Sequence, residues 1–373
     1  MTYDVAVVGL GAMGSAAGFH LARRGARVVA FDRFWPPHPH GSSHGKTRII
    51  RLGYFEDPAY VPLLRRAYQL WGEIERLSRR RLMEITGIAE IGPADGKLVT
   101  GTLAASRGHD LPHEVLDAAE FMRRIPTFRL DPGYVAVVQP EGGILQPEAA
   151  VVTQLALART AGAHLRTGET VRFVERRGTG VCVTTDRGAI EAGTAIIAAG
   201  AWTKKLMPDS RLPLRVTRQV VTWFEPRDGV RFASPNFPVF MIETARGIHY
   251  GFPLDETGVK FAKHHHADEA VDPDACERTV SAADIDLIRP VLAECLPDAN
   301  GRLLQANTCL YAMTPDGHFV IDRLPDVPQI LVVSACSGHG FKFAPVIGEI
   351  LADLATKGAT AHDISRFRLA RFG

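Results

Sequence analysis

The first residues of this chain that could do chemistry form a glycine-rich turn between an apolar run and a helical stretch. Gly9-Leu10-Gly11-Ala12-Met13-Gly14 follows Val5-Ala6-Val7-Val8 directly and matches the pattern G-x-G-x-x-G. In such a turn Gly9 permits the sharp reversal, Gly11 lets the backbone approach a pyrophosphate, and Gly14 lets helix and strand pack closely. The helix N-terminus then offers free N–H groups and a positive dipole end to the phosphates. The turn therefore predicts a dinucleotide site.

The sequence also predicts the strands and the helix that must position this turn. The apolar, β-branched run 5–8 predicts a buried strand, and the amphipathic stretch after the turn predicts a helix that ends at Gly25. Residues 26–31 predict a second strand, and Asp32 at its end is placed to accept hydrogen bonds from a ribose. The alternative is an ordinary glycine turn in another kind of α/β protein.

The composition excludes several classes of protein. With 373 residues, 46% hydrophobic and 23% charged, the chain fits two globular domains. A formal net charge of +2 gives no electrostatic case for binding nucleic acid or an anionic membrane. No apolar stretch approaches the roughly 20 residues of a membrane helix, and the first strand begins too near Met1 to leave room for a signal peptide. We expect no nucleic-acid or membrane partner.

The cysteines argue against two kinds of structural site. They are five in number, scattered and without C-x-x-C spacing, so neither a disulfide framework nor a zinc site is expected, and a reducing cytoplasm is the predicted location. These residues are Cys182, Cys276, Cys295, Cys309 and Cys336.

Dinucleotide-type strands recur in three blocks of the chain. Residues 35–45 cannot form regular structure, and a helical region follows over 60–81. Further strands are predicted at 168–174, 180–185 and 194–202, between 223 and 250, and at 330–335, where Ser337-Gly338-His339-Gly340 turns into a helix over 342–357. This pattern predicts an α/β fold in which a discontinuous nucleotide domain is interleaved with a mixed-sheet substrate domain. The expected segments are 1–82, 146–212 and 320–373 for the first domain, and 83–145 and 213–319 for the second.

Taken together, the motifs resemble a known family. The chain is similar from end to end to the FAD-dependent amine oxidases of the sarcosine oxidase and N-methyl-tryptophan oxidase family, which implies a Rossmann-like FAD domain of the glutathione-reductase type. The motifs that carry the resemblance are the turn 9–14, His40-Gly41-Ser42-Ser43-His44-Gly45 with Thr47-Arg48-Ile49-Ile50-Arg51, Tyr250-Gly251-Phe252-Pro253, Cys309-Leu310-Tyr311, and Ser337-Gly338-His339-Gly340-Phe341-Lys342-Phe343.

The resemblance implies FAD as cofactor and Cys309 as its covalent attachment site, through a thioether to the 8-methyl carbon of the flavin. A thiolate is a good nucleophile for that carbon, whereas a small buried free thiol is the alternative. The residues expected to contact FAD are Gly9, Gly11, Ala12, Met13, Gly14, Asp32, Ser42, His44, Thr47, Arg48, Val171, Gly200, Trp202, Cys309, Gly338, Gly340 and Lys342.

The same resemblance implies a substrate clamp and catalytic cations. Arg51 and Lys342 match the residues that hold the substrate carboxylate, a task suited to a guanidinium and an ammonium. Arg48 and Lys260 match cations beside the flavin, and Lys260 matches the lysine credited with oxygen activation. Around the substrate amine and methyl groups the matching residues are Met241, Tyr250 and His264.

The implied reaction is the oxidative demethylation of an N-methyl amino acid, sarcosine first and bulkier substrates such as N-methyl-tryptophan second, with reoxidation by O2. The family also implies a monomer. A nicotinamide dehydrogenase, a non-catalytic binding module and a flavin dehydrogenase with another electron acceptor remain as alternatives.

Three features depart from the family pattern, and a fourth invites another interpretation. Lys46 stands where an acidic residue is familiar, His249 stands where a tyrosine is familiar, and residues 254–258 are short and acidic; we expect all three to border the pocket. His264-His265-His266 does not predict a metal site, because consecutive strand residues would point to opposite faces.

Overall fold

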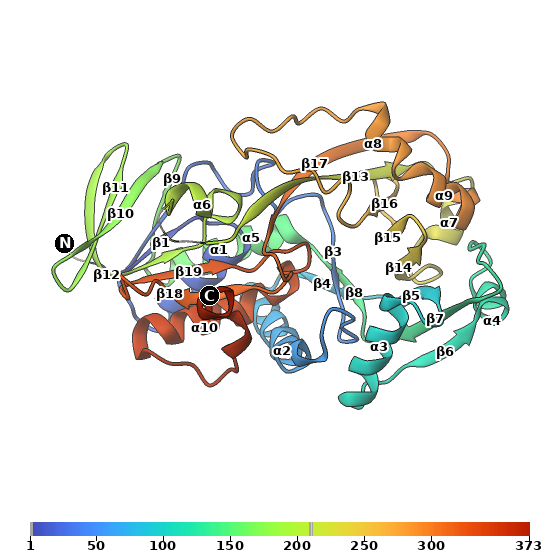
Figure 1. The fold of residues 1–373 in the computed structure, drawn as a ribbon, viewed down its shortest axis with the longest axis horizontal. Helices are drawn as coiled ribbons and strands as arrows, with labels where there is room; N and C mark the ends of the chain where they lie inside the picture. Colours follow the sequence, from blue (N-terminus) through green and yellow to red (C-terminus); the bar gives the residue numbers. More distant parts are fainter. Residues whose placement is uncertain (1–2, 209, 211) are drawn as a thin grey trace.

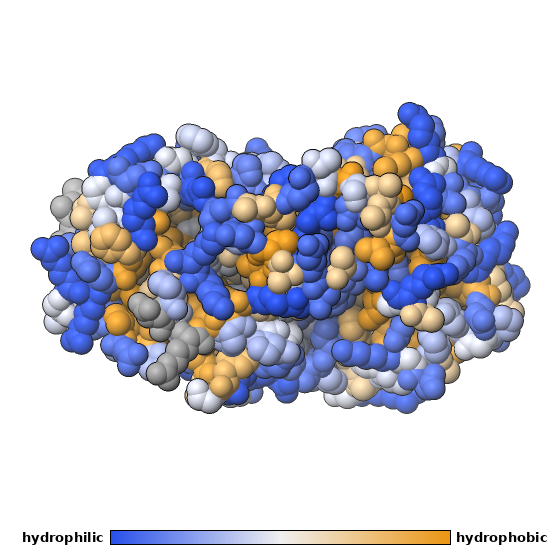
Figure 2. Space-filling model, turned by 45° about the horizontal axis from the view of Figure 1, so that its top comes forward, coloured by the Kyte–Doolittle hydropathy of each residue, from blue (hydrophilic) through white to orange (hydrophobic). Residues whose placement is uncertain are grey.

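The computed structural model describes residues 3–208, 210 and 212–373. It is elongated, with two lobes joined along a waist, and each lobe is built on one large sheet (Figure 1). The face drawn in Figure 2 is largely hydrophilic and is indented where the two lobes meet. Residues 1, 2, 209 and 211, which fall in the predicted segments 1–82 and 146–212, lie outside the described residues.

The first sheet contains the predicted dinucleotide strands. Its order is β10-β11-β12-β1-β2-β9, with β19 beside β12 and β18 beside β19. β1 pairs in parallel with both β2 and β12, and β12 pairs in parallel with β19, so strands from three distant parts of the chain lie side by side. The bounds are β1 Tyr3–Val8, β2 Val28–Asp32, β9 His164–Thr167, β10 Val171–Arg177, β11 Gly180–Thr185, β12 Gly188–Ile197, β18 Val320–Arg323 and β19 Ile330–Ser334.

Helices cover this sheet and share one hydrophobic core with it. α1 packs against both α5 and α10, and α10 packs against α2. Gly348 of α10 lies so close to α1 that an added Cβ would come 2.6 Å from Ala16. The bounds are α1 Ala12–Arg23, α2 Val61–Ser78, α5 Pro147–Thr160, α6 Thr203–Leu206 and α10 Ala344–Lys357.

The second sheet is mixed and forms the other lobe. Its order is β17-β13-β16-β15-β14-β5-β7-β6, with a parallel pair only between β14 and β5. A phenylalanine cluster that includes Phe128, Phe237 and Phe240 fills the core behind it. The bounds are β5 Ile88–Pro93, β6 Glu114–Asp117, β7 Tyr134–Gln139, β13 Arg215–Phe224, β14 Val239–Thr244, β15 Gly247–Leu254, β16 Val259–Lys263 and β17 Leu303–Met313, with α3 Lys97–Gly108, α4 Ala118–Arg124, α7 Gly229–Phe232, α8 Ala282–Asp286 and α9 Arg289–Cys295.

A small third sheet lies between the two lobes. β3 (Arg48–Ile50) and β4 (Met83–Ile85) both pair with β8 (Gly143–Leu145). This sheet fixes the start of the segment 48–56, which carries Arg48 and Arg51.

The predicted α/β architecture with a mixed second sheet is confirmed, while one local prediction is wrong. Gly200-Ala201-Trp202 is a 3-10 turn after β12, not the end of a strand. The strands expected between 223 and 250 are present as β14 and β15, after a break over residues 225–238. The predicted final helix is α10, which begins at Ala344 after a 3-10 turn over Phe341–Phe343. The boundaries of the two domains stay a prediction, since the strand pairing alone does not assign every segment. Within the described residues, no helix is long and apolar enough to cross a membrane.

Candidate active site

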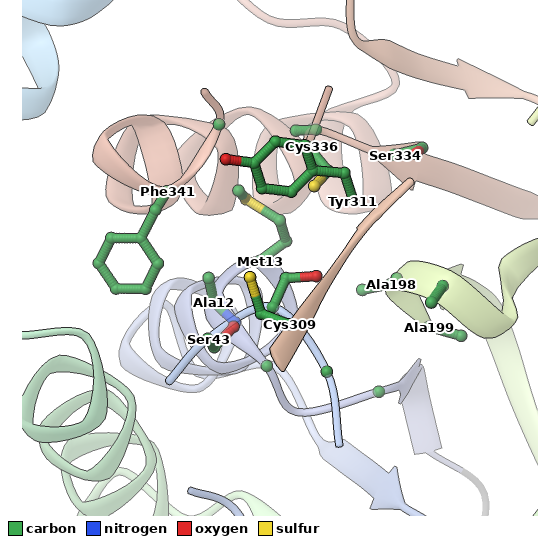
Figure 3. Close-up of a pocket in the computed structure, with 18 of the residues that line it drawn as sticks. Ala12, Met13, Ser43, Ala198, Ala199, Cys309, Tyr311, Ser334, Cys336 and Phe341 are labelled. Atoms are coloured by element: carbon green, nitrogen blue, oxygen red, sulfur yellow. The ribbon is translucent and has the colours of Figure 1, made fainter. Parts of the chain in front are cut away.

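A cavity of about 450 Å³ runs between the two sheets and is lined by residues from both. One end is formed by the glycine turn after β1 and by Asp32, and the other by Arg51, His264 and Lys342. Figure 3 shows Cys309 on β17 beside Ala12 and Met13 at the start of α1, with Ala198 and Ala199 on the far side. The cavity thus connects the predicted dinucleotide turn with the predicted substrate residues.

The glycine turn has the geometry that a pyrophosphate requires. Gly9 has φ +93°, which disfavours any side chain, and a Cβ on Gly14 would lie 1.7 Å from the carbonyl oxygen of Gly9. Gly11 precedes α1, whose first residue, Ala12, donates its N–H to Ser43 Oγ at 3.1 Å. The turn therefore brings bare backbone and the N-terminus of α1 to the cavity wall.

Asp32 holds the turn and still faces the cavity. Its Oδ2 accepts the N–H of Leu10 at 2.8 Å, and its Oδ1 accepts the N–H of Phe34 at 2.8 Å. A carboxylate has about four acceptor positions, so both oxygens retain capacity for a ribose hydroxyl. The cradle and the carboxylate together fit the adenosine and diphosphate part of FAD.

Arg48 is hydrogen-bonded to the loop between β2 and β3, part of which lines the cavity. Its guanidinium donates to the carbonyl oxygens of Ser42 (2.8 Å), His44 (2.6 Å) and Thr47 (2.8 Å). The hydroxyl of Ser42 donates in turn to the carbonyl of Leu310, next to Cys309. Arg48 and Ser42 line the cavity, whereas His44 and Thr47 do not. Burial, followed by the charge of Arg48, lowers the pKa of His44 to about 4.

Cys309 is buried in β17 and lines the cavity. Burial raises the pKa of its thiol, while the nearby cations Arg48 and Lys260 oppose that shift. Its sulfur is free in the structure, as are the four other cysteines. Cys336 lines the same cavity, and Figure 3 shows it next to Tyr311. The cysteines that look scattered in the sequence therefore include two in one site.

Arg51 is buried and already paired. Its Nη2 donates to both carboxylate oxygens of Glu56 at 2.8 and 2.6 Å, and its Nη1 donates to the carbonyl of Gly53 at 2.6 Å. Glu90 Oε1 lies 3.4 Å from Nη1. Burial alone would raise the pKa of Glu56, but Arg51 foremost brings it down to about 2. A substrate carboxylate at Arg51 would therefore join an existing ion pair.

Lys342, the second cation of the predicted carboxylate clamp, makes fewer hydrogen bonds than Arg51 does. Its Nζ donates to the carbonyl of His339 at 2.9 Å and lies 5.2 Å from the ring centre of Tyr54. Burial and then the charge of Arg51 lower the pKa of Lys342 to about 7, against the attraction of Glu56 and Glu90. An ammonium has three donors, and in the described part of the chain only one is used.

The sheet of the second lobe supplies the opposite wall. Met241 on β14 pairs with Tyr250 on β15, so both side chains share the face toward the cavity. His264 follows β16, also lines the cavity, and has its pKa lowered well below the ordinary value, first by burial and then by His265. Burial raises the pKa of Tyr250 to about 12. These three side chains present a wall without charge near neutral pH.

The three consecutive histidines do not lie in a strand, which corrects the reason given for excluding a metal. His264 and His265 form a turn after β16, and His265 has φ +55°. Their rings are 3.9 Å apart, whereas His266 is buried and its Nε2 lies 3.0 Å from Asp284 Oδ1. The turn, not strand alternation, places His266 beside Asp284 and away from the other two rings.

Lys260 lies behind the cavity wall instead of on it. Its Nζ donates to the carbonyl oxygens of Gly45 (2.6 Å) and Thr47 (3.0 Å) and to Thr47 Oγ1 (3.0 Å), and it lies 5.2 Å from the ring centre of Trp223. Burial, then Arg48, lowers the pKa of Lys260 well below its ordinary value. The lysine thereby joins β16 to the loop that follows β2.

The structure brings most of the predicted site residues to one cavity. Gly14, His44 and Lys260 are buried near it without lining it, and the half-buried Thr47 does not line it either. The predicted residues that line it are Gly9, Gly11, Ala12, Met13, Asp32, Ser42, Arg48, Arg51, Val171, Gly200, Trp202, Met241, Tyr250, His264, Cys309, Gly338, Gly340 and Lys342.

Several cavity residues escaped the prediction. Ser43, Tyr311 and Phe341 lie inside the quoted motifs, so the motifs themselves carried the signal. Cys336 and Glu56 have no local signal, because only the tertiary fold brings them to the wall.

The expectation that three departures border the pocket is wrong. None of Lys46, His249 and 254–258 is among the residues that line the cavity. His249 is buried on the opposite face of β15, where its ring stacks on Phe261 at 5.6 Å. Lys46 pairs with Glu256 at 2.8 Å, so it joins the 254–258 loop on the outside.

Comparison with known proteins agrees with this site. A model of the family described as FAD dependent oxidoreductase (DAO) matches residues 4–354. The chain is 44% identical to monomeric sarcosine oxidase of Streptomyces avermitilis, with 98% of this chain and 97% of that protein covered. It is 37% identical to N-methyl-L-tryptophan oxidase of Salmonella dublin, with both chains fully covered.

A solved structure of similar fold is NikD, an unusual amino acid oxidase essential for nikkomycin biosynthesis. The TM-score is 0.86 and the identity 29%, over 98% of this chain and 97% of that one. The chain therefore belongs to the FAD dependent oxidoreductase family. Within it, the chain falls with the monomeric sarcosine oxidases and N-methyl-L-tryptophan oxidases, and the predicted FAD-dependent oxidoreductase is confirmed.

Proposed function

We propose that this enzyme oxidises N-methyl amino acids, with sarcosine as the first substrate to test. The overall reaction consumes one O2 and one water: R–NH–CH3 + O2 + H2O → R–NH2 + HCHO + H2O2. Sarcosine would give glycine, formaldehyde and hydrogen peroxide. The names of the relatives, monomeric sarcosine oxidase and N-methyl-L-tryptophan oxidase, support this substrate class.

One observation carries the proposal. The same cavity has a dinucleotide cradle at one end and Arg51 with Lys342 at the other, so a cofactor and a carboxylate can occupy it together. A buried guanidinium and ammonium form a site for a small anion. Met241 and Tyr250, on the facing wall, supply apolar surface for an N-methyl group.

The residues around the substrate would act by charge and position. Lys342 and Arg51 hold the carboxylate, and His264, kept neutral by burial, can hydrogen-bond the amine without repelling a developing positive charge. The amine has to bind unprotonated, since an ammonium has no lone pair to drive hydride loss. Bound FAD would supply the acceptor for the hydride of the methyl carbon and would allow reoxidation by O2.

We propose that FAD is attached through Cys309, and that Lys260 and Arg48 assist the reaction with O2. Cys309 lines the cavity near the turn, and Arg48 and Lys260 oppose the rise in the pKa of its thiol that burial causes. Preorganised hydrogen-bond donors and positive groups lower the cost of forming an anion in a buried site, and both Lys260 and Arg48 are held in place by hydrogen bonds to the same loop. The name of the relatives supports a monomer, and five free thiols support the cytoplasm.

N-methyl-L-tryptophan is the second candidate substrate. A relative with that name at 37% identity favours it. Peroxide release should be measured with sarcosine, N-methyl-L-alanine and N-methyl-L-tryptophan, with the corresponding primary amino acids as controls. The largest kcat/KM identifies the preferred substrate. If no N-methyl amino acid reduces the FAD-loaded protein, the substrate class is wrong; reduction without peroxide would instead indicate a dehydrogenase.

A further inference from the structure

Glu90 is a carboxylate in the middle of an otherwise apolar strand. Its neighbours in β5, Ile88, Ala89 and Ile91, are buried hydrophobic residues, and Glu90 itself is 0% exposed. Strand register pairs Glu90 with Met241 of β14. Residues paired in this way point to the same side of a sheet, so Glu90 shares the face that Met241 presents to the cavity.

The Glu90 carboxylate accepts no hydrogen bond of ordinary geometry within the described residues, although the hydroxyl of Thr102 lies near enough to lower its pKa. Both of its oxygens are buried without a partner, and the nearest cation is Arg51, whose Nη1 lies 3.4 Å from Oε1. The hydrogen bonds of Arg51 are directed elsewhere, to Glu56 and to the carbonyl of Gly53. An ionised carboxylate is costly in such a place unless it is compensated.

The charges around Arg51 balance before a substrate arrives. When all four groups are ionised, Arg51 and Lys342 supply two positive charges, and Glu56 and Glu90 supply two negative charges. A substrate carboxylate would add a third negative charge to a buried cluster. Because buried charges must be paired, the cluster needs either one more cation or one fewer anion.

We propose that Glu90 supplies this balance: the substrate carboxylate binds at Arg51 and Lys342 together with one proton from solvent, which Glu90 takes up. This inference rests on the proposed function, because it assumes an anionic substrate at that clamp. Glu90 does not line the cavity, so it is a positioning residue that acts through Arg51. The step forms one O–H bond on the carboxylate of Glu90, and the proton leaves a water or buffer acid in the solvent; no other covalent bond changes.

The surroundings favour Glu90 over Glu56 as the proton acceptor. Burial raises the pKa of Glu90 to about 7, with Arg51 opposing and Glu56 adding to the shift. Glu56, bonded twice to Arg51, has its pKa lowered to about 2 and stays ionised.

Among the other groups around Glu90, one could also take up the proton. Thr102 of α3 offers a hydroxyl that lowers the pKa of Glu90, and the register neighbours Met241 of β14 and Val137 of β7 are apolar. Lys342, whose pKa is also lowered to about 7, is the second group that could gain a proton near neutral pH. The experiment has to separate Glu90 from Lys342.

The test is calorimetric binding of propionate, a carboxylate that cannot be oxidised as an amine, to the FAD-loaded protein. Titrations at pH 8 in two buffers of different ionisation enthalpy give the number of protons taken up. We expect the wild-type protein to take up about one proton more than Glu90→Gln. Between pH 6 and pH 8, the Kd of the wild-type protein for propionate should rise about tenfold more than the Kd of Glu90→Gln does.

The variants make the result decisive. Glu90→Val is a second neutral variant in case Glu90→Gln folds poorly, which thermal unfolding and FAD content would reveal. Glu243→Gln is the matched control: this carboxylate on β14 accepts the N–H of Leu98 at 2.8 Å, and its loss should leave proton uptake at the wild-type value. With sarcosine at pH 8, Glu90→Gln should lower KM about tenfold while kcat stays within about twofold.

Equal proton uptake in wild-type protein and Glu90→Gln would assign the proton to Lys342 and overturn the inference. A failure of propionate to bind either protein would contradict the carboxylate clamp itself, and the inference with it. The proposed function is therefore tested by binding, and the role of Glu90 by the difference in proton uptake.

Discussion

Lys260 Nζ donates a 2.6 Å hydrogen bond to the carbonyl oxygen of Gly45, which lies 215 residues earlier in the chain. This bond joins β16 in the second lobe to the loop that follows β2 in the first. Arg48 donates to carbonyl oxygens of the same loop. The two cations expected beside the flavin are thus also the ones that hold the loop in place.

Lys260→Met should slow reoxidation by O2 much more than reduction by substrate. Removal of a preorganised positive group costs about 100-fold in rate where charge develops, and only the O2 step is expected to place an anion there. Stopped-flow absorbance measures the two half-reactions separately. Lys263→Met, at the end of the same strand, is the control and should change neither rate; equal slowing of both half-reactions by Lys260→Met would indicate a structural role only.

Cys309→Ser should release the flavin from the protein on acid precipitation. The hydroxyl is too weak a nucleophile to form the tether, so nearly all the yellow colour should move from the pellet to the supernatant. Cys336→Ser, in the same cavity, should keep the colour in the pellet. If the two variants behave the other way round, Cys336 is the attachment site.

Lys342→Met should raise KM for sarcosine and spare the overall fold. A hydrogen bond to a charged group contributes about 1.5–3 kcal/mol, which corresponds to an increase in KM of about 10- to 100-fold. Steady-state peroxide release gives the value. Lys357→Met, in the exposed last turn of α10, should leave KM unchanged, and an unchanged KM in Lys342→Met would remove this lysine from the clamp.

Two glycines of α1 should respond in opposite ways to alanine. Gly14→Ala places a Cβ 1.7 Å from the Gly9 carbonyl oxygen, which should abolish FAD binding and lower the free energy of unfolding by about 2–3 kcal/mol. Gly18, four residues on, has nothing within 4 Å of an added Cβ, so Gly18→Ala should raise it by about 0.5–1 kcal/mol. Chemical denaturation and FAD content measure both, and a tolerated Gly14→Ala would contradict the close approach.

Low pH should lower the stability of the second lobe, because Asp284 becomes protonated. Burial alone would raise the pKa of this carboxyl, but hydrogen bonds led by Arg218 hold it well below its ordinary value. Its contribution to stability is therefore complete above pH about 4 and is lost as the pH falls below that value. Asp284→Asn should lower the free energy of unfolding at pH 7 by about 3 kcal/mol.

The pH dependence checks the same carboxyl. Denaturant titrations from pH 7 to pH 2 should show a shallower acid loss in Asp284→Asn than in the wild-type protein. Glu294→Gln, in an exposed pair with Arg246, is the control and should follow the wild-type curve. Parallel curves for Asp284→Asn and the wild type would exclude Asp284 as a source of the acid loss.

The parts of the fold that depend on local sequence could be predicted. β1, the turn 9–14, α1 and β2 follow each other within 32 residues, and their periodicity and glycines specify them without help from the rest of the chain. The apolar run 194–202 predicts a strand that is too long, because it continues into Gly200-Ala201-Trp202, where a 3-10 turn forms instead.

The parts that depend on contacts between distant segments could not be predicted. Glu90 looks like an odd charge in a strand until the register with Met241 and the approach of Arg51 are known. Cys336 and Cys309 are separated in sequence yet line one cavity. The motifs that carry the family resemblance contain most of the site residues. They do not predict the ion pair between Arg51 and Glu56, which a substrate carboxylate at Arg51 would have to join.

The pairing of β12 with both β1 and β19 has a consequence for biosynthesis. The first sheet takes its strands from the beginning, the middle and the end of the chain, and β19 is complete only at Ser334. While the ribosome is still translating the second lobe, the nucleotide-binding sheet lacks its last parallel neighbour. Stable capture of the cofactor must therefore wait until nearly all of the chain has emerged from the ribosomal tunnel.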